Sequence, residues 1–405
     1  MPSAPVEGEP VPDDGSLPEK SAHAFGQRPF SVYVHVPYCA SRCGYCDFNT
    51  YTAAELGTHA SQQGYAAQAI SEIRLARRVL GDKTVPVSTV FFGGGTPTLL
   101  PPQDLAAILD AIDGEFGLAP GAEVTTEANP DSVTNSSLEQ LRSAGFTRIS
   151  FGMQSVATNV LAILERTHTP GRAVEAVAQA REAGFEHVNV DLIYATPGET
   201  REDFARSLDA AIGSGADHVS AYSLIVEDGT RLASKVRRGE IADVDDDIAA
   251  DRYVQADDAL SAAGFQWYEV SNWARSGAEC RHNLAYWRSD DWWGIGPGAH
   301  SHIAGTRWWN VRHPSSYGER LDAGKSPAQA RELLTRDQQR DESILLGIRL
   351  REGLVVEPLT DTQRGIIAAA ADQGLVVPDW QESGVVVLTH KGRLLADRLA
   401  IDLLT

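Results

Sequence analysis

The middle of the chain alternates short apolar runs with longer amphipathic stretches. Strand-like runs cover residues 32–36, 87–92, 123–127, 148–154, 187–193 and 218–225, and helical stretches between them include 64–80, 102–116 and 172–183. An Ala-Gly-Phe motif recurs at 144–146, 183–185 and 263–265, where the glycine can end a helix and the phenylalanine can begin a strand. This order predicts the α/β class and a partial (β/α)6 TIM-type barrel, whose chemistry lies at the C-terminal ends of its strands.

The pattern changes at both ends of the barrel. Residues 1–28 are rich in Pro, Gly, Ser and acidic residues and predict a disordered tail without a secretory signal. The barrel then covers 29–265, an aromatic segment 266–325, and a C-terminal winged-helix-like domain 326–405. That domain is predicted from helices at 331–350, 360–373 and 392–404 and a strand at 384–388. With few basic residues, it suits a lid or a partner-docking surface better than DNA binding.

Charge and hydropathy narrow the class of protein. The 405 residues carry a formal net charge of −20, with a pI near 4.9. This acidity argues against nucleic acid as a partner, because binding phosphates requires clustered Lys and Arg. No stretch reaches the roughly 20 apolar residues of a transmembrane helix. We expect a cytoplasmic protein without a transmembrane segment.

Three cysteines follow the first strand with the spacing C-x-x-x-C-x-x-C: Cys39, Cys43 and Cys46. A disulfide framework would need an even number, and the remaining cysteine, Cys280, lies far along the chain. A zinc site would need a fourth ligand, such as Asp47 or His35. A [4Fe–4S] cluster normally takes four thiolates, so three would leave one iron open to a small molecule. The sequence therefore favours such a cluster.

Polar and glycine residues mark the ends of the next strands. Gly93-Gly94-Gly95-Thr96 would let the backbone approach a ligand closely, although a tight turn is the plain alternative. Glu127 could pair with a cation or be a solvated acid, and Asp191 could meet ribose hydroxyls, with help from Gln154, or form a buried ion pair. Arg166 offers a planar fork for a carboxylate.

Together these elements resemble the radical SAM superfamily, whose open iron chelates the amino and carboxylate groups of S-adenosylmethionine. Over most of the chain they resemble one branch, the oxygen-independent coproporphyrinogen III oxidases and their haem-chaperone relatives. The resemblance implies an electron donor of flavodoxin or ferredoxin type. It also implies an S-adenosylmethionine site lined by Tyr33, Gly94, Gly95, Thr96, Glu127, Gln154, Arg166 and Asp191.

A second motif, H-N-x-x-Y-W, spans His282 to Trp287 and resembles the signature of the haem chaperones. Histidine is an axial ligand of haem iron, and Tyr286 and Trp287 offer flat apolar faces to a macrocycle. Asn283 could orient the imidazole or meet a propionate. The plain alternative is a histidine satisfied within the core. Cys280 is interpreted as a buried thiol.

Phe48 stands where the resembling oxidases carry a further cysteine. Together with the H-N-x-x-Y-W motif, it favours a HemW-like haem chaperone, which binds haem and passes it to acceptor apoproteins. The alternative is a coproporphyrinogen III oxidase that decarboxylates propionates by radical chemistry. A radical enzyme acting on an unrelated substrate is a third interpretation.

Overall fold

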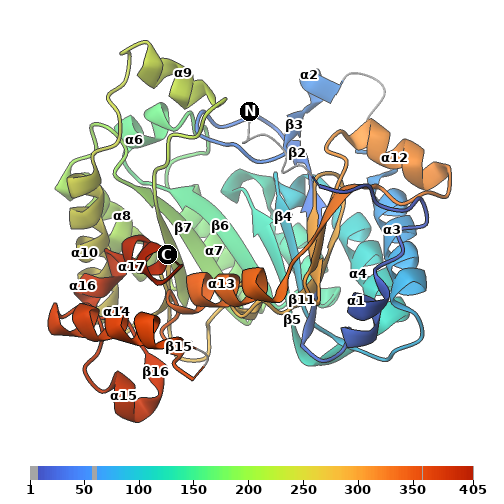
Figure 1. Cartoon of the computed structure of the whole chain (residues 1–405). Coiled ribbons are helices and arrows are strands. Elements are labelled where there is room, and N and C mark those ends of the chain that lie inside the picture. Colours follow the sequence, from blue (N-terminus) through green and yellow to red (C-terminus); the bar gives the residue numbers. More distant parts are fainter. Residues whose placement is uncertain (1–7, 57–61, 358, 405) are drawn as a thin grey trace.

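The computed structural model describes residues 8–56, 62–357 and 359–404. Its centre is one mixed, 12-stranded sheet with the order β14-β13-β12-β11-β1-β4-β5-β6-β7-β8-β10-β9 (Figure 1). The six predicted strands lie side by side in this sheet and are all parallel. They are β1 (Phe30–Val36), β4 (Val87–Gly94), β5 (Leu118–Ala128), β6 (Arg148–Gln154), β7 (His187–Tyr194) and β8 (His218–Ser223).

The predicted partial barrel is confirmed. Helices follow the strands and bury their apolar faces against the sheet, most of them in one large core and two, which carry Val160 and Leu232, in a smaller cluster. These helices are α3 (Tyr65–Leu80), α4 (Pro102–Phe116), α5 (Asn135–Ser143), α6 (Thr158–Ile163), α7 (Arg172–Glu182), α8 (Arg201–Gly213), α9 (Arg231–Arg237) and α10 (Asp246–Ala262). The barrel stays open because β8 pairs on its far side with the antiparallel strand β10 (Asn272–Ala274) and not with β1.

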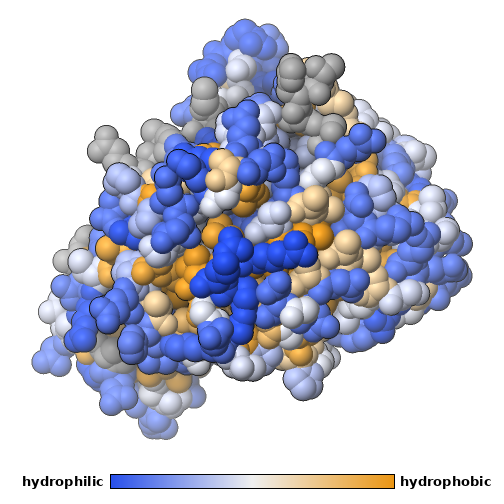
Figure 2. Space-filling view, turned by 90° about the vertical axis from the view of Figure 1, so that its right-hand side faces the viewer, coloured by the Kyte–Doolittle hydropathy of each residue, from blue (hydrophilic) through white to orange (hydrophobic). Residues whose placement is uncertain are grey.

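Helix α3 illustrates how the sequence pattern fixes an outer layer. Its Ala69, Ile73, Ala76 and Leu80 are buried at helical spacing, whereas Arg74 and other polar residues face outward. Figure 2 shows this side of the molecule, where hydrophilic residues cover most of the surface and hydrophobic residues appear between them. No helix among the described residues is both long and apolar enough to cross a bilayer.

The aromatic segment does not form a unit of its own, contrary to the predicted boundaries. It extends the central sheet at both edges, because β11 pairs in parallel with β1 while β10 pairs with β8. Helix α11, which carries the H-N-x-x-Y-W motif, contacts β4. The elements are β9 (Gln266–Glu269), β10, α11 (Arg281–Trp287), β11 (Asp291–Ile295), β12 (His300–Ile303), β13 (Thr306–Asn310) and α12 (Pro314–Asp322).

The predicted disordered tail is wrong for residues 8–28, and residues 1–7 lie outside the described residues. Glu9 pairs with Arg331 through two backbone hydrogen bonds and an ion pair. A short helix, α1 (Glu19–Ala24), follows, and its Ser21 hydroxyl bonds the Thr306 hydroxyl at 2.7 Å. Phe25 is buried against Phe30. These few anchors order a segment whose overall composition is polar.

The C-terminal module begins later than predicted. Residues 328–333 form strand β14 (Ala328–Leu333), because they pair with β13 at the edge of the central sheet, and α13 (Arg336–Gly347) begins only after the capping residue Thr335. The module has its own core. Its remaining elements are β15 (Leu354–Val355), α14 (Asp361–Asp372), α15 (Trp380–Ser383), β16 (Val385–Val386), α16 (His390–Arg393) and α17 (Ala396–Leu404).

The module is attached beside helix α10, where Arg393 forms a buried bidentate ion pair with Asp257 at 2.9 and 2.6 Å. Figure 1 places it at the lower left, whereas the short elements that follow the first strand, β2 (Tyr38–Cys39), β3 (Tyr51–Thr52) and α2 (Ala53–Leu56), lie at the top with α9. The module therefore does not cover the C-terminal ends of the strands, and the lid prediction is wrong. Partner docking stays a prediction.

Candidate functional site

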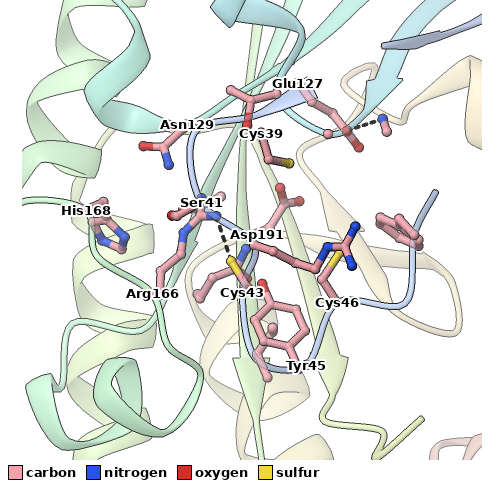
Figure 3. Close-up of a pocket in the computed structure, with 18 of the residues that line it drawn as sticks. Cys39, Ser41, Cys43, Tyr45, Cys46, Glu127, Asn129, Arg166, His168 and Asp191 are labelled. Carbon is pink, nitrogen blue, oxygen red and sulfur yellow. Dashed lines mark hydrogen bonds between the residues drawn. The ribbon is translucent and has the colours of Figure 1, made fainter. Parts of the chain in front are cut away.

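A cavity of about 540 Å³ opens at the C-terminal ends of the parallel strands. Its walls come from the cysteine loop after β1 and from the ends of β4 to β8 (Figure 3). Seven of the eight residues predicted to line an S-adenosylmethionine site are brought together here, with all three loop cysteines. The seven are Gly94, Gly95, Thr96, Glu127, Gln154, Arg166 and Asp191.

The cysteine loop is held against the glycine turn by backbone hydrogen bonds. The Gly95 amide donates to the Val36 carbonyl and the Thr96 amide to the Tyr38 carbonyl, both at 2.8 Å. A side chain at Gly95 would collide with the Tyr38 backbone, so the close approach requires glycine. In Figure 3 the three sulfurs point toward a common space.

The cysteine chemistry fits a metal cluster. Partial burial raises the pKa of the Cys39 thiol to about 11 and also raises the pKa of Cys46, so the bare thiols would stay protonated at neutral pH. A metal provides the positive charge that stabilises thiolates. Among the residues that the structure describes, no three His, Cys, Asp or Glu side chains gather around one point as a single ion requires. Thiolates of a [4Fe–4S] cluster bind separate irons and need no such convergence, so this geometry fits a cluster better than zinc.

Arg166 lies directly beside the cysteines. Its Nη1 donates to the Cys43 sulfur at 3.5 Å and its Nη2 to the Gly152 carbonyl at 3.0 Å. The buried Nε has no hydrogen-bond partner among the described residues. A Cβ at Gly152 would come within 2.8 Å of Nη2, so a larger residue there would displace the end of the Arg166 side chain. Arg166 lines the cavity, and since only two of the five N–H groups of its guanidinium are used, others can donate to a carboxylate ligand.

Two carboxylates face the same cavity. Glu127 accepts a hydrogen bond from the Gly94 amide at 3.1 Å, and Asp191 accepts from the Ser150 hydroxyl at 3.0 Å and from the Asn189 amide at 2.7 Å. Burial, reinforced by the charge of Asp191, raises the pKa of Glu127 to about 8, and burial also raises the pKa of Asp191. Because two buried acids repel each other, a bound cation would stabilise them, and an ammonium or sulfonium suits this wall.

Gln154 reaches the cavity through an unusual backbone. Its φ of 64° lies in the left-handed region, and the register between β6 and β7 shifts at this point. Such a conformation costs free energy for a residue other than glycine and is concentrated at ligand sites. The bulge turns the end of the strand so that the Gln154 side chain lies at the cavity wall.

Sequence reasoning missed further residues of this wall: Ser41, Tyr45, Asn129 and His168 (Figure 3). His168 is only 6% exposed, and its Nδ1 has no hydrogen-bond partner among the described residues. Burial, followed by the charge of Arg166, lowers its pKa to about 4, so the imidazole is neutral at physiological pH. Its position two residues after Arg166 was the only available signal.

Tyr33 does not line this cavity, and its predicted contact with S-adenosylmethionine stays a prediction. It lies in a neighbouring cavity of about 360 Å³, which shares Asp47, Phe48, Gly94 and Glu127 with the first. The Tyr33 hydroxyl and the His35 Nδ1 are 3.0 Å apart. Tyr33 therefore lines the cavity that borders the predicted cofactor site, together with Gly94 and Glu127.

His282 is not the accessible ligand that the sequence suggested. It is 1% exposed, and its ring stacks on Phe91 with centroids 5.2 Å apart. Its Nδ1 donates to the Thr89 hydroxyl at 2.7 Å, because that hydroxyl already donates to Ser31. Its Nε2 is then left to accept from the Tyr286 hydroxyl at 3.0 Å. Both ring nitrogens are used, and the plain alternative, a satisfied core histidine, describes this structure.

The rest of the motif divides between core and cavity. The Asn283 side chain donates a hydrogen bond to the Glu269 carboxylate at 3.2 Å and so connects α11 to β9. Tyr286 lines the neighbouring cavity and meets Trp292 edge to face at 4.8 Å. Trp287 is half-buried and lines neither cavity. Cys280 is buried, as predicted.

Comparison with known proteins identifies the class first. The family model described as the Radical SAM superfamily matches residues 33–211. The solved structure of the Escherichia coli coproporphyrinogen III oxidase (HemN), described as a radical SAM enzyme, superposes with a TM-score of 0.81. The comparison covers 100% of this chain and 96% of that one at 22% identity, which establishes the fold alone.

Curated relatives then narrow the family. A protein of Mycobacterium tuberculosis named heme chaperone HemW is 52% identical over 93% of this chain and 95% of its own length. The heme chaperone HemW of Bacillus subtilis is 31% identical over 91% of this chain and 97% of its own length. A mitochondrial protein of Bos taurus, radical S-adenosyl methionine domain-containing protein 1, is 34% identical over 94% of this chain and 86% of its own. The chain therefore belongs to the radical SAM superfamily and, within it, to the family of these HemW relatives.

Proposed function

We propose that this protein is a haem chaperone, which binds haem and passes it to haem-free acceptor proteins. The observation that carries the proposal is its 52% identity, across nearly the whole chain, to a protein named heme chaperone HemW. Phe48 supports it, because this 62% exposed side chain at the cavity mouth has no thiol to offer where the oxidases carry a cysteine. The four cysteines of the protein are free thiols, which suits the cytoplasm, where cysteines stay reduced.

The proposal includes a [4Fe–4S] cluster on Cys39, Cys43 and Cys46, with S-adenosylmethionine beside it. Arg166 would bind the methionine carboxylate, Glu127 the ammonium, and Asp191 with Gln154 the ribose hydroxyls. When bound, such a cluster supplies an open iron and, with a flavodoxin or ferredoxin as electron donor, an electron to its ligand. The raised pKa of Glu127 and its buried position beside Asp191 support a cationic ligand.

The test is an anaerobic assay of one reconstituted preparation. We expect saturable haem binding and no conversion of coproporphyrinogen III in the presence of S-adenosylmethionine and a reductant. Turnover of coproporphyrinogen without saturable haem binding would reject the chaperone and favour the oxidase. Phe48→Cys is an informative second variant, because it places a thiol where the oxidases carry one without changing the cluster ligands.

A further inference from the structure

The neighbouring cavity has the composition of a ligand site. It measures about 360 Å³ and lies between β1, the cysteine loop and the loop that precedes β12. Its aromatic lining comes from Tyr33, Phe48, Tyr286 and Trp292, and two of its polar lining groups are His300 and Arg312. Mainly apolar walls with a few convergent polar groups are typical of a cofactor site.

The histidines in and around this cavity differ in whether their ring nitrogens already form hydrogen bonds. His35 bonds Tyr33 through Nδ1 and the Asn49 carbonyl through Nε2, at 3.0 and 2.9 Å. His282 also uses both nitrogens, and His302 contacts the Asp290 carbonyl at 3.2 Å and accepts from the Gly305 amide at 3.0 Å. A histidine with both nitrogens engaged cannot bind iron until one of these bonds is broken.

His300 is the exception. It is exposed, and its imidazole forms no hydrogen bond with any residue that the structure describes. Its ring stacks on Trp309 with centroids 5.9 Å apart and an interplanar angle of 24°. Although His300 reaches the surface, neighbouring groups partly desolvate its ring; this desolvation, followed by the charge of Arg312, lowers the pKa of His300 and favours the neutral, metal-binding imidazole.

Arg312 provides the complementary charge. It is half-buried and lines the same cavity, yet it forms no ion pair within the described part of the chain. A guanidinium of this kind binds a carboxylate well, because its planar donors match two oxygens. A neutral imidazole and a free guanidinium on one aromatic-walled cavity match the iron and a propionate of haem.

The loop that carries His300 is fixed from two sides. The Gly296 amide donates to the buried Glu72 carboxylate at 2.8 Å. Asn49 donates to the carbonyls of Pro297 at 3.0 Å and Arg312 at 2.9 Å. Because these bonds fix the backbone that carries His300 and Arg312, only the two side chains have to be ordered when a ligand binds, which favours affinity.

We propose that His300, and not His282, is the axial ligand of haem, and that Arg312 binds a haem propionate in this cavity. The inference rests on the proposed chaperone function and adds where haem binds and which residue ligates its iron. An iron ligand at the molecular surface also suits a carrier, since its bond can be replaced by a ligand of the acceptor protein.

The test is haem titration of the full-length, cluster-loaded protein, followed by Soret and electron paramagnetic resonance spectra. For His300→Ala we expect at least tenfold weaker haem binding, with unchanged iron–sulfur content, and partial rescue by added imidazole. His300→Cys should give the spectrum of a thiolate-ligated haem. His23→Ala, which removes an exposed histidine on α1, is the control and should match the wild type.

The outcomes separate the two claims. If the wild type binds no haem, the proposed function fails. If the wild type binds haem and both His300 variants keep its affinity and spectrum, only the assignment of His300 fails. A lost axial signature in His282→Gln, with folding shown by its circular dichroism and cluster content, would overturn the assignment in favour of His282.

Arg312 is tested with a modified ligand. Arg312→Gln should weaken haem binding about tenfold, because a charge-assisted hydrogen bond is lost. The dimethyl ester of haem, which has no carboxylates, should bind the variant and the wild type equally. Equal losses for both ligands would show that Arg312 acts through the shape of the cavity and would overturn the propionate contact.

Discussion

Asn49 donates a hydrogen bond to the Pro297 carbonyl over 3.0 Å, and this contact joins the cysteine loop to the loop of His300. Asn49 lies three residues after Cys46, so any displacement of the cluster ligands reaches the neighbouring cavity by a short path. The two cavities also share Gly94 and Glu127. The proposed cluster and haem sites are therefore adjacent and mechanically linked.

Removing the Asn49 hydrogen bond should lower haem affinity more than it lowers the iron content of the cluster. Asn49→Ala leaves the Pro297 carbonyl without its side-chain donor and removes one of the two donors of the Arg312 carbonyl, which Tyr51 also bonds. Such a loss costs about 1–3 kcal/mol of stability. We expect weaker haem binding and unchanged iron content, measured by Soret titration and iron analysis. Asn159→Ala, at an exposed position on α6, is the matched control. Loss of iron with retained haem affinity would contradict the proposed path.

The cluster assignment predicts about four irons per chain after anaerobic reconstitution, counted by iron and sulfide analysis. Replacing Cys39, Cys43 or Cys46 with Ala should abolish the cluster, because each thiolate is expected to hold a different iron. Cys280→Ala should retain it, since Cys280 is buried beside Glu123, away from the loop. A cluster that depended equally on Cys280 would contradict the assignment to three cysteines.

Arg166 and Asp191 should control S-adenosylmethionine affinity without changing the iron content. Arg166→Lys should weaken binding about 10- to 100-fold, because an ammonium cannot reproduce two parallel hydrogen bonds. Asp191→Asn should weaken it less, since the amide still reaches hydroxyl groups. Calorimetry on cluster-loaded variants measures both effects. Unchanged affinity in the two variants would make these residues structural.

The burial of His282 predicts a pH-dependent stability. Desolvation lowers its native pKa to about 4, against 6.5 in the unfolded chain, so only the unfolded state binds the proton between these values. Stability should therefore fall as the pH drops, by about 2 kcal/mol between pH 7 and 5 from this residue alone. His168 and His302, whose pKa values are also lowered to about 4, add to the fall.

Urea unfolding at both pH values checks this prediction. His282→Gln keeps a polar side chain but cannot titrate, so its loss of stability between pH 7 and 5 should be about 2 kcal/mol smaller than that of the wild type. An identical pH dependence in the two proteins would mean that His282 is accessible to protons in the native state, and would restore it as a candidate haem ligand.

The six parallel strands could be predicted because their apolar runs and the returns between them are local signals. The edge strand β14 could not, since residues 328–333 become a strand only through pairing with β13. The same holds for the N-terminal segment, where a few long-range contacts of Glu9, Ser21 and Phe25 outweigh a polar composition.

The first cavity was predictable for a similar reason: Glu127, Arg166 and Asp191 follow strand ends that a parallel sheet brings together. His282 was misassigned because its environment comes from distant parts of the chain. Its partner Thr89 lies 193 positions earlier, on the strand against which α11 packs. A motif indicates which residues matter, whereas burial and hydrogen bonding decide what each can bind.

Haem transfer tests the central claim most directly. Cluster-loaded protein carrying about one haem per chain is mixed anaerobically with increasing amounts of a haem-free cytochrome, and the Soret shift of the cytochrome is followed in time. The account predicts a rate that rises with acceptor concentration, because transfer occurs in a complex. No saturable haem loading, or a rate independent of the acceptor and equal to spontaneous release, would contradict it.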